Sequence, residues 1–182
     1  MREVIISLVQ SINGAYAQDG WSTGVSTPTD FTYFVGLRRR AGAILIDRRT
    51  ALNPQLPMIN APGKVLEHTP VYVLTESDAE VLSQQLAERG LDYRAVHFTP
   101  DTLPEVIAGL ETTGDMLLCE SGPNLAYRLL DHGPGVELHL SISPRYLKDA
   151  GTHFSALDAD IPLRVRGVEQ RDDQVIIRYV RA

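Results

Sequence analysis

Two arginines and a threonine follow directly on a short apolar run in the segment IDRRT (46–50). Guanidinium groups suit phosphate because each can donate two parallel, charge-assisted hydrogen bonds. Arg48 and Arg49, with Arg38–Arg40, place five of the 17 basic residues within 12 positions, which predicts a locally positive site. For Arg38–Arg40 the carboxyl-terminal end of a helix is the simpler interpretation, because the helix dipole favours cations there. Arg48 and Arg49 fit a phosphate site and an ordinary surface equally well.

A second segment, ESGPNL (120–125), places small residues where a strand gives way to a helix. Ser121 and Gly122 let the backbone come close to a phosphate or a flat ring. One Gly-Pro pair at such a junction is a weak motif, and an ordinary helix start explains it too. A third segment, SING (11–14), follows the first apolar run, and a plain turn is the alternative there.

Asp30 stands in the segment TPTDF (27–31), which has the residues typical of a helix start. Thr27 can cap the helix, and Pro28 suits its first position. A carboxylate in the first turn stabilises the positive end of a helix by ~0.5–1 kcal/mol. Helix capping is thus the role that the residues alone indicate for Asp30, and it does not exclude a contact with a ligand.

The composition excludes several classes of protein. The chain has 182 residues, of which 17 are basic and 23 acidic, and its net charge of −6 disfavours nucleic-acid binding. Its one cysteine, Cys119, allows no internal disulfide, and the five histidines lack metal-like spacing with carboxylates, so we expect no metal. No apolar stretch approaches the ~20 residues that span a bilayer, and VIISLV (4–9) is too short for a signal peptide. These features predict a cytoplasmic protein that binds neither membranes nor nucleic acids.

The elements that must position these segments alternate between strands and helices. Strands are predicted at 4–9, 43–46, 71–74, 93–98, 115–120 and 136–142, helices at 27–42, 77–90, 102–114 and 122–133, and a closing hairpin at 162–170 and 174–180. The alternation predicts an α/β fold of three layers, with a mostly parallel central sheet and a C-terminal antiparallel hairpin at one edge. No linker interrupts it, so residues 1–182 are expected to form a single domain. Because the carboxyl ends of parallel strands meet at one edge, the three polar loops should lie close together.

Three long segments resemble the riboflavin-pathway pyrimidine reductases, which have the dihydrofolate-reductase-like fold. SINGAYAQDG (11–20) is similar to their S-[LV]-D-G segment, and LRRRAGAILIDRRTAL (37–52) to L-R-x-x-A-D-A-[IV]-L-V-G-A-G-T. LLCESGPNLAYRLLDHGPGVELHLSISP (117–144) is similar to E-G-G-P-x-L…G-x-V-D-E-L-x-[LV]-x-[IV]-[AS]-P, and this match is the most specific. The resemblance corresponds to the reductase half of the bifunctional deaminase–reductase. It implies an NADPH-dependent, usually homodimeric reductase of a pyrimidine- or pteridine-like heterocycle, similar to 5-amino-6-(5-phosphoribosylamino)uracil reductase.

The resemblance also implies which residues meet the cofactor and the substrate. NADPH would lie across the carboxyl ends of the strands, with contacts from Arg48, Arg49, Thr50, Ser121, Gly122 and Asn124. Asp30 and Asn13 would face the heterocycle, and Asp30 would anchor it or relay a proton. PTDFTYF (28–34) and IDRRT (46–50) are similar to the substrate helix and cofactor loop of dihydrofolate reductase itself. By that likeness Arg48 faces the 2′-phosphate of NADPH.

Four positions depart from the reductase pattern. Asn13 replaces the usual aspartate, Ser7 a frequent lysine, Asp47 the usual glycine, and Ser121 the first of two glycines. A carboxylate at position 47 would repel a pyrophosphate unless a neighbouring arginine neutralises it. Two alternatives therefore stay open: a non-catalytic dimeric relative that has lost turnover, and a true dihydrofolate reductase.

Overall fold

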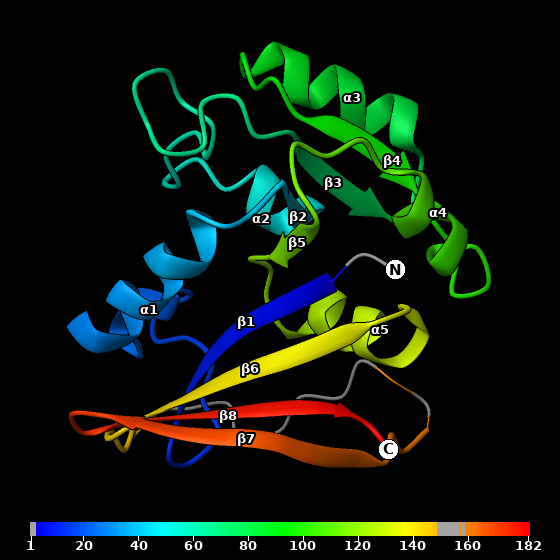
Figure 1. Cartoon of the computed structure of the whole chain (residues 1–182). Coiled ribbons are helices and arrows are strands. Elements are labelled where there is room, and N and C mark those ends of the chain that lie inside the picture. The colour runs from blue at the N-terminus through cyan, green and yellow to red at the C-terminus, as the bar shows by residue number, and fades with distance from the viewer. Residues whose placement is uncertain (1–2, 149–156, 158) are drawn as a thin grey trace.

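The computed structural model describes residues 3–148, 157 and 159–182, and its centre is one sheet of eight strands in the order β4-β3-β2-β5-β1-β6-β8-β7 (Figure 1). The strands are β1 (Glu3–Ser11), β2 (Ala43–Asp47), β3 (Val71–Thr75), β4 (Arg94–His97), β5 (Met116–Cys119), β6 (Val136–Ser143), β7 (Leu163–Arg171) and β8 (Gln174–Arg181). Strands β1 to β6 are parallel, whereas β8 runs antiparallel to both β6 and β7. The predicted mostly parallel sheet with an antiparallel hairpin at one edge is confirmed.

Helices cover both faces of the parallel part of the sheet. They are α1 (Pro28–Arg38), α2 (Arg48–Ala51), α3 (Ala79–Glu88), α4 (Leu103–Gly109) and α5 (Pro123–His132), with a short 3-10 helix at Ser22–Gly24. The side chains of neighbouring strand residues pack into separate hydrophobic cores on the two faces of the sheet. Leu45 and Leu117 pack with α4 and α5, whereas Ile44 and Leu118 pack with α1 and α3. This is why strands buried on both faces read as continuous apolar runs. Figure 1 shows α5 behind β6, while none of the described helices lies in front of β6, β8 and β7.

Several boundaries differ from those predicted. The helix expected at 27–42 ends at Arg38, and the one expected at 102–114 ends at Gly109. The segment after β2, expected to be loop, begins with the one-turn helix α2. Thr27 caps α1 as predicted, because its side chain accepts a hydrogen bond from the Asp30 N–H at 3.1 Å.

Two glycines bring the chain segments before β2 and β5 into close contact. Gly42 N–H donates to the Met116 carbonyl at 2.8 Å, and its own carbonyl accepts from Thr113 N–H at 2.9 Å. A Cβ atom on Gly42 would lie 2.4 Å from the backbone nitrogen of Gly114. Because Gly42 has no side chain, the segments that lead into β2 and β5 can lie side by side.

Candidate active site

The loops after β2 and β5 meet at the carboxyl edge of the sheet, as the sequence predicted. The Asp47 N–H donates to Ser121 Oγ at 3.0 Å, and the hydroxyls of Thr50 and Ser121 are 3.4 Å apart. Ser121 is buried, and Thr50 is half-buried. The structure thus brings Thr50 and Ser121, two of the expected cofactor residues, into one polar contact.

Asp47 is the N-cap residue of α2. Its Oδ1 atom accepts a hydrogen bond from the Thr50 N–H at 2.7 Å. The donor that a phosphate would meet at this turn is therefore taken by a carboxylate of the protein itself. The departure from glycine at this position has a structural role, since a capping aspartate typically stabilises a helix by ~1 kcal/mol.

The other expected cofactor residues lie around this contact. Arg48 and Arg49 are exposed, and Arg48 Nη2 donates to Gln85 Oε1 of α3 at 3.2 Å. Gly122 is the N-cap residue of α5, and no side chain caps that helix within the described residues. Asn124 is exposed in the first turn of α5. The start of α5 therefore presents free backbone N–H groups at the positive end of a ten-residue helix dipole.

Arg38 makes an ion pair that the sequence did not predict. Its Nε and Nη2 atoms donate to the two carboxylate oxygens of Glu120 at 2.6 and 2.5 Å, and its guanidinium stacks 4.5 Å from the Phe34 ring centre. The Glu120 side chain is only 4% exposed. Burial raises the pKa of this carboxyl, and the Arg38 guanidinium opposes that rise. We expected Arg38 only to complement the helix dipole; its main contact instead ties α1 to the end of β5.

Asp30 lies at the start of α1 and is 7% exposed. Ser26 Oγ donates to its Oδ2 atom at 2.5 Å. Thr27 Oγ1, which caps the same turn, donates to Gln174 Oε1 of β8 at 2.8 Å. The Gln174 side-chain nitrogen and Ser143 Oγ are buried without a hydrogen-bond partner in the described part of the chain. Ser26 thus holds the predicted substrate carboxylate directly, and Thr27 joins the same helix start to β8.

Asn13 uses its side chain to hold two loops together. Its Oδ1 atom accepts from Ser11 Oγ at 2.7 Å and from Leu147 N–H at 3.1 Å, and its Nδ2 atom donates to the Leu147 carbonyl at 2.9 Å. These contacts join the turn after β1 to the segment after β6. No described contact connects Asn13 with Asp30.

A buried polar chain crosses the face of β6, and sequence reasoning did not assign it a role. Tyr33 OH lies 2.6 Å from His139 Nδ1, and His139 Nε2 lies 3.0 Å from Glu137 Oε1. Arg166 Nη1 donates to the other oxygen of Glu137 at 2.6 Å. Burial lowers the pKa of His139, although the neighbouring Glu137 opposes this, and burial raises the pKa of Tyr33. The signal in the sequence was the polar residue at every second position of VELHLSIS (136–143).

The strand register places these hydrogen-bonded side chains beside Ser7, one of the positions that depart from the reductase pattern. Ser7 of β1 pairs with His139 of β6. The frequent lysine of the reductases would therefore stand next to His139, whereas here the short Ser7 side chain does.

The described residues contain no cluster of three or more histidine, cysteine or acidic side chains suited to a metal ion. No helix in the described part of the chain is long and apolar enough to cross a membrane.

Comparison with known proteins decides the family, because the family described as the RibD C-terminal domain matches residues 2–177. The chain belongs to the RibD C-terminal domain family. No curated protein matches the sequence. This family is the reductase part of the riboflavin-pathway enzymes that the sequence resembles, so the predicted membership is confirmed.

Solved structures share the dihydrofolate-reductase-like fold of this RibD C-terminal domain. A pyrimidine reductase-like protein from Corynebacterium diphtheriae is 16% identical with a TM-score of 0.73, and the match covers 100% of this chain and 92% of that one. The riboflavin biosynthesis reductase Rib7 from Saccharomyces cerevisiae is 13% identical with a TM-score of 0.61, covering 100% and 90%. RibD from Acinetobacter baumannii is 16% identical with a TM-score of 0.61, and this chain spans 58% of its length.

Proposed function

We propose that this chain is a nicotinamide-dependent reductase of a pyrimidine-like heterocycle in riboflavin biosynthesis. Membership of the RibD C-terminal domain family carries this proposal. The geometry supports it, because the contact between the loops after β2 and β5 lies beside the uncapped start of α5 at the carboxyl edge of the sheet. Ligands bind at this edge in open parallel sheets.

NADPH is the cofactor that we propose, and the residues at this edge fit it in part. The N–H groups at Gly122 and Asn124 suit a pyrophosphate, and the exposed guanidiniums of Arg48 and Arg49 suit the 2′-phosphate. Thr50 and Ser121 would shape the floor between them. When bound, the cofactor supplies the hydride, and the protein supplies binding and orientation.

Asp30 is the residue that we propose to anchor the heterocycle. It is buried, it accepts from Ser26, and it lies in the first turn of α1, which Thr27 joins to Gln174 at the start of β8. A carboxylate held in this way can accept paired hydrogen bonds from an amino group and a ring N–H. Asn13 would act indirectly, because it fixes the loop that follows β1.

We also propose that the chain works as a single-domain homodimer joined through β7. This strand has an unpaired edge and is exposed along its length, with Val165 57% and Val168 63% exposed. Such an edge is a template for pairing with a second copy. The main competing function is a dimer that has lost turnover, and the Asp47 carboxylate on the Thr50 N–H favours it.

Titration with NADPH and with NADH, followed by nicotinamide fluorescence, tests the proposal. Charged hydrogen bonds to a 2′-phosphate contribute ~1.5–3 kcal/mol, so NADPH should bind roughly 10–150-fold more tightly. Arg48→Ala should lose that preference, whereas Arg39→Ala, on the exposed end of α1, should keep it. Asp30→Asn should keep NADPH binding. It should lower the rate at which NADPH is oxidised when 5-amino-6-(5-phosphoribosylamino)uracil is the substrate. No binding at millimolar NADPH would leave the non-catalytic dimer as the better account.

A further inference from the structure

A hollow lies at the opposite end of the sheet from the candidate active site. It has a volume of about 750 Å³ and is bordered by the start of β6, the ends of α5 and β8, and the beginning of β7. Val136, which lines the hollow, begins β6. At the other end of this strand Ile142 pairs with Val175, next to the Gln174 that contacts Thr27. Seven residue steps of ~3.3 Å put the two ends roughly 23 Å apart. A ligand in this hollow would therefore not occupy the proposed reductase site.

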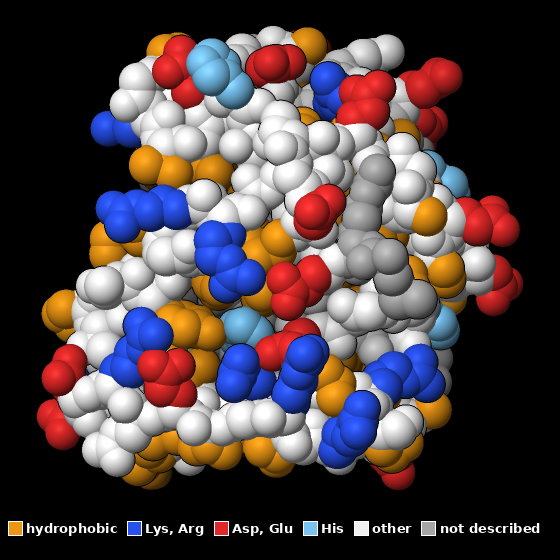
Figure 2. Space-filling view, viewed as in Figure 1, with side chains coloured by type: hydrophobic (Ala, Val, Ile, Leu, Met, Phe, Trp, Pro, Cys, Tyr) orange, Lys and Arg blue, Asp and Glu red, His pale blue; other side chains and the backbone are white. Residues whose placement is uncertain are grey.

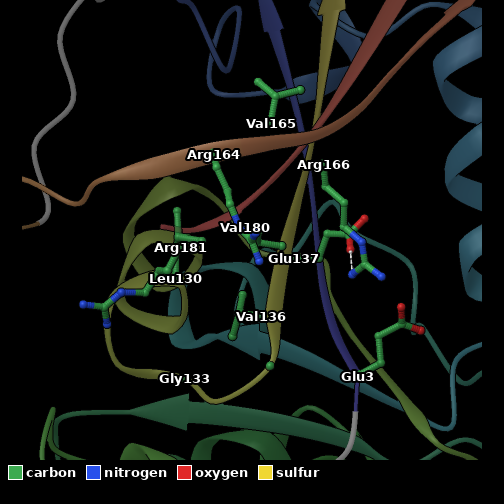
Figure 3. A pocket seen from close by; sticks show the side chains of 11 residues that line it. Glu3, Leu130, Gly133, Val136, Glu137, Arg164, Val165, Arg166, Val180 and Arg181 are labelled. Atoms are coloured by element: carbon green, nitrogen blue, oxygen red, sulfur yellow. Dashed lines mark hydrogen bonds and ion pairs between the residues drawn. The ribbon is translucent and has the colours of Figure 1, made fainter.

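The size of the hollow suits a small organic molecule, because ligand pockets typically measure ~300–1,000 Å³. Its walls are more polar than those of most such pockets, which favours a charged ligand. Leu130, Val136 and Val180 supply apolar surface here, and Arg164, Arg166 and Arg181 supply charge. Glu137 and Glu3 complete the polar lining (Figure 3).

The acidic groups around the hollow are already paired with arginines. Glu137 accepts from Arg166 at 2.6 Å and lies 4.0 Å from Arg178. Glu3 lies 3.6 Å from Arg40. Together with the pair between Arg181 and Asp131, these paired groups number four guanidiniums and three carboxylates. Arg164 also lines the hollow, so the excess is two positive charges.

Arg164 is the side chain that this arrangement leaves without a counter-charge. Within the described residues it makes no hydrogen bond and no ion pair, although it lines the hollow. Figure 3 shows its side chain running from β7 toward β6, while Arg166 turns to Glu137 and Arg181 points the other way. Figure 2 shows basic side chains gathered over the β7–β8 hairpin, in a protein whose net charge is −6.

We propose that the hollow is a second ligand site, which binds a small organic anion through Arg164. The ligand has a phosphate or carboxylate head and a flat apolar body. The head group would meet the Arg164 guanidinium, with Arg166 beside it, and the body would cover Val136 and Val180. A guanidinium gives such a head group two parallel, charge-assisted hydrogen bonds.

Isothermal titration calorimetry with phenyl phosphate, benzoate and benzyl alcohol tests this site. Phenyl phosphate or benzoate should bind saturably, and the tighter of the two identifies the head group. Neutral benzyl alcohol should bind at least tenfold more weakly. Arg164→Ala should weaken anion binding about 10–100-fold. Arg39→Ala, at the exposed arginine that follows α1, should leave anion binding unchanged. Arg164 is exposed on an edge strand, so the variant should keep the thermal unfolding curve of the parent.

Three results would overturn the proposal. One is equal phenyl phosphate affinity in the parent and in Arg164→Ala. Another is loss of phenyl phosphate binding when NADPH is saturating, which would place the anion at the dinucleotide edge. The third is a change in sedimentation-derived oligomeric state in Arg164→Ala with unchanged anion affinity, which would assign this arginine to a subunit interface. None of these results depends on whether the chain turns over a pyrimidine.

Discussion

The Tyr33 hydroxyl and His139 Nδ1 are 2.6 Å apart, and this contact joins α1 to β6. His139 Nε2 is 3.0 Å from Glu137 Oε1, so a neutral imidazole satisfies both neighbours when Nε2 carries the proton. Tyr33 then donates to Nδ1. A second proton on the ring would turn Nδ1 into a donor to the Tyr33 oxygen and would place a positive charge on a buried side chain.

We predict that His139 makes stability fall in mild acid. Its folded-state pKa lies below the ordinary value of 6.5, chiefly because of burial, so the unfolded chain binds a proton first. The contribution to stability is present above about pH 6.5 and is lost as the pH falls through the folded pKa. Urea unfolding between pH 7.5 and 5 should show this decline, and His139→Gln should flatten it. His68→Gln, an exposed control, should keep the decline; equal curves for both variants would contradict the assignment.

The Arg38–Glu120 pair predicts a destabilised variant that acid partly rescues. Arg38→Ala leaves a carboxylate that is 4% exposed without its partner, and such a loss typically costs ~3–5 kcal/mol. Burial already raises the pKa of Glu120, so the variant can take up a proton as the pH falls. Chemical unfolding at pH 8 and pH 5 should give the larger loss at pH 8. The adjacent Arg39→Ala should differ little from the parent at either pH, and a pH-independent loss in Arg38→Ala would count against this account.

Replacing Asp47 should strengthen the binding of a nicotinamide cofactor. Asp47→Gly removes a negative charge from the turn and frees the Thr50 N–H, while glycine remains an acceptable N-cap. A gain of ~1.4 kcal/mol corresponds to about tenfold in NADPH affinity. Fluorescence titration measures it. Asp78→Gly, which removes the equivalent cap of α3, is the matched control and should leave affinity unchanged. Weaker binding in Asp47→Gly would show that the carboxylate supports the cofactor loop.

The contact between Gly42 and Gly114 predicts an asymmetric pair of variants. A Cβ on Gly42 would lie 2.4 Å from the Gly114 nitrogen, whereas a Cβ on Gly114 would meet Gly42 Cα at 3.5 Å, an ordinary contact. Overpacking of this kind typically costs ~1–3 kcal/mol. Gly42→Ala should therefore lower the midpoint of thermal unfolding by several degrees, and Gly114→Ala should change it little. Similar midpoints for the two variants would rule out this explanation.

The sequence predicted the architecture because its signals were local and repeated. Continuous apolar runs at 4–9 and 43–46 can be satisfied only in a sheet covered on both faces, and the structure has them as β1 and β2. The one-turn helix α2 was missed because four residues carry no periodicity, and its cap comes from Asp47. The ion pair of Arg38 with Glu120 joins residues 82 positions apart, a separation that only the fold brings together.

For the candidate site, the sequence predicted which loops meet but not which side chains contact one another. The loops after β2 and β5 could be placed together because parallel strands end at one edge, and Asp47 does contact Ser121. The partners of a side chain could not be predicted, since they depend on packing. Asn13 illustrates this, because its amide is used by Leu147, which lies 134 positions away.

The strand order also bears on how the chain is made. β1 lies between β5 and β6, so this strand, which is synthesised before the other seven described strands, pairs with residues 116–119 and 136–143. By contrast, β2, β3 and β4 are neighbours in sequence and in the sheet. Strands β2, β3 and β4 can therefore pair during synthesis, while the apolar β1 remains unpaired and can associate with non-native strands. Synthesis arrested before residue 116 yields a nascent chain whose first strand has neither of its native neighbours.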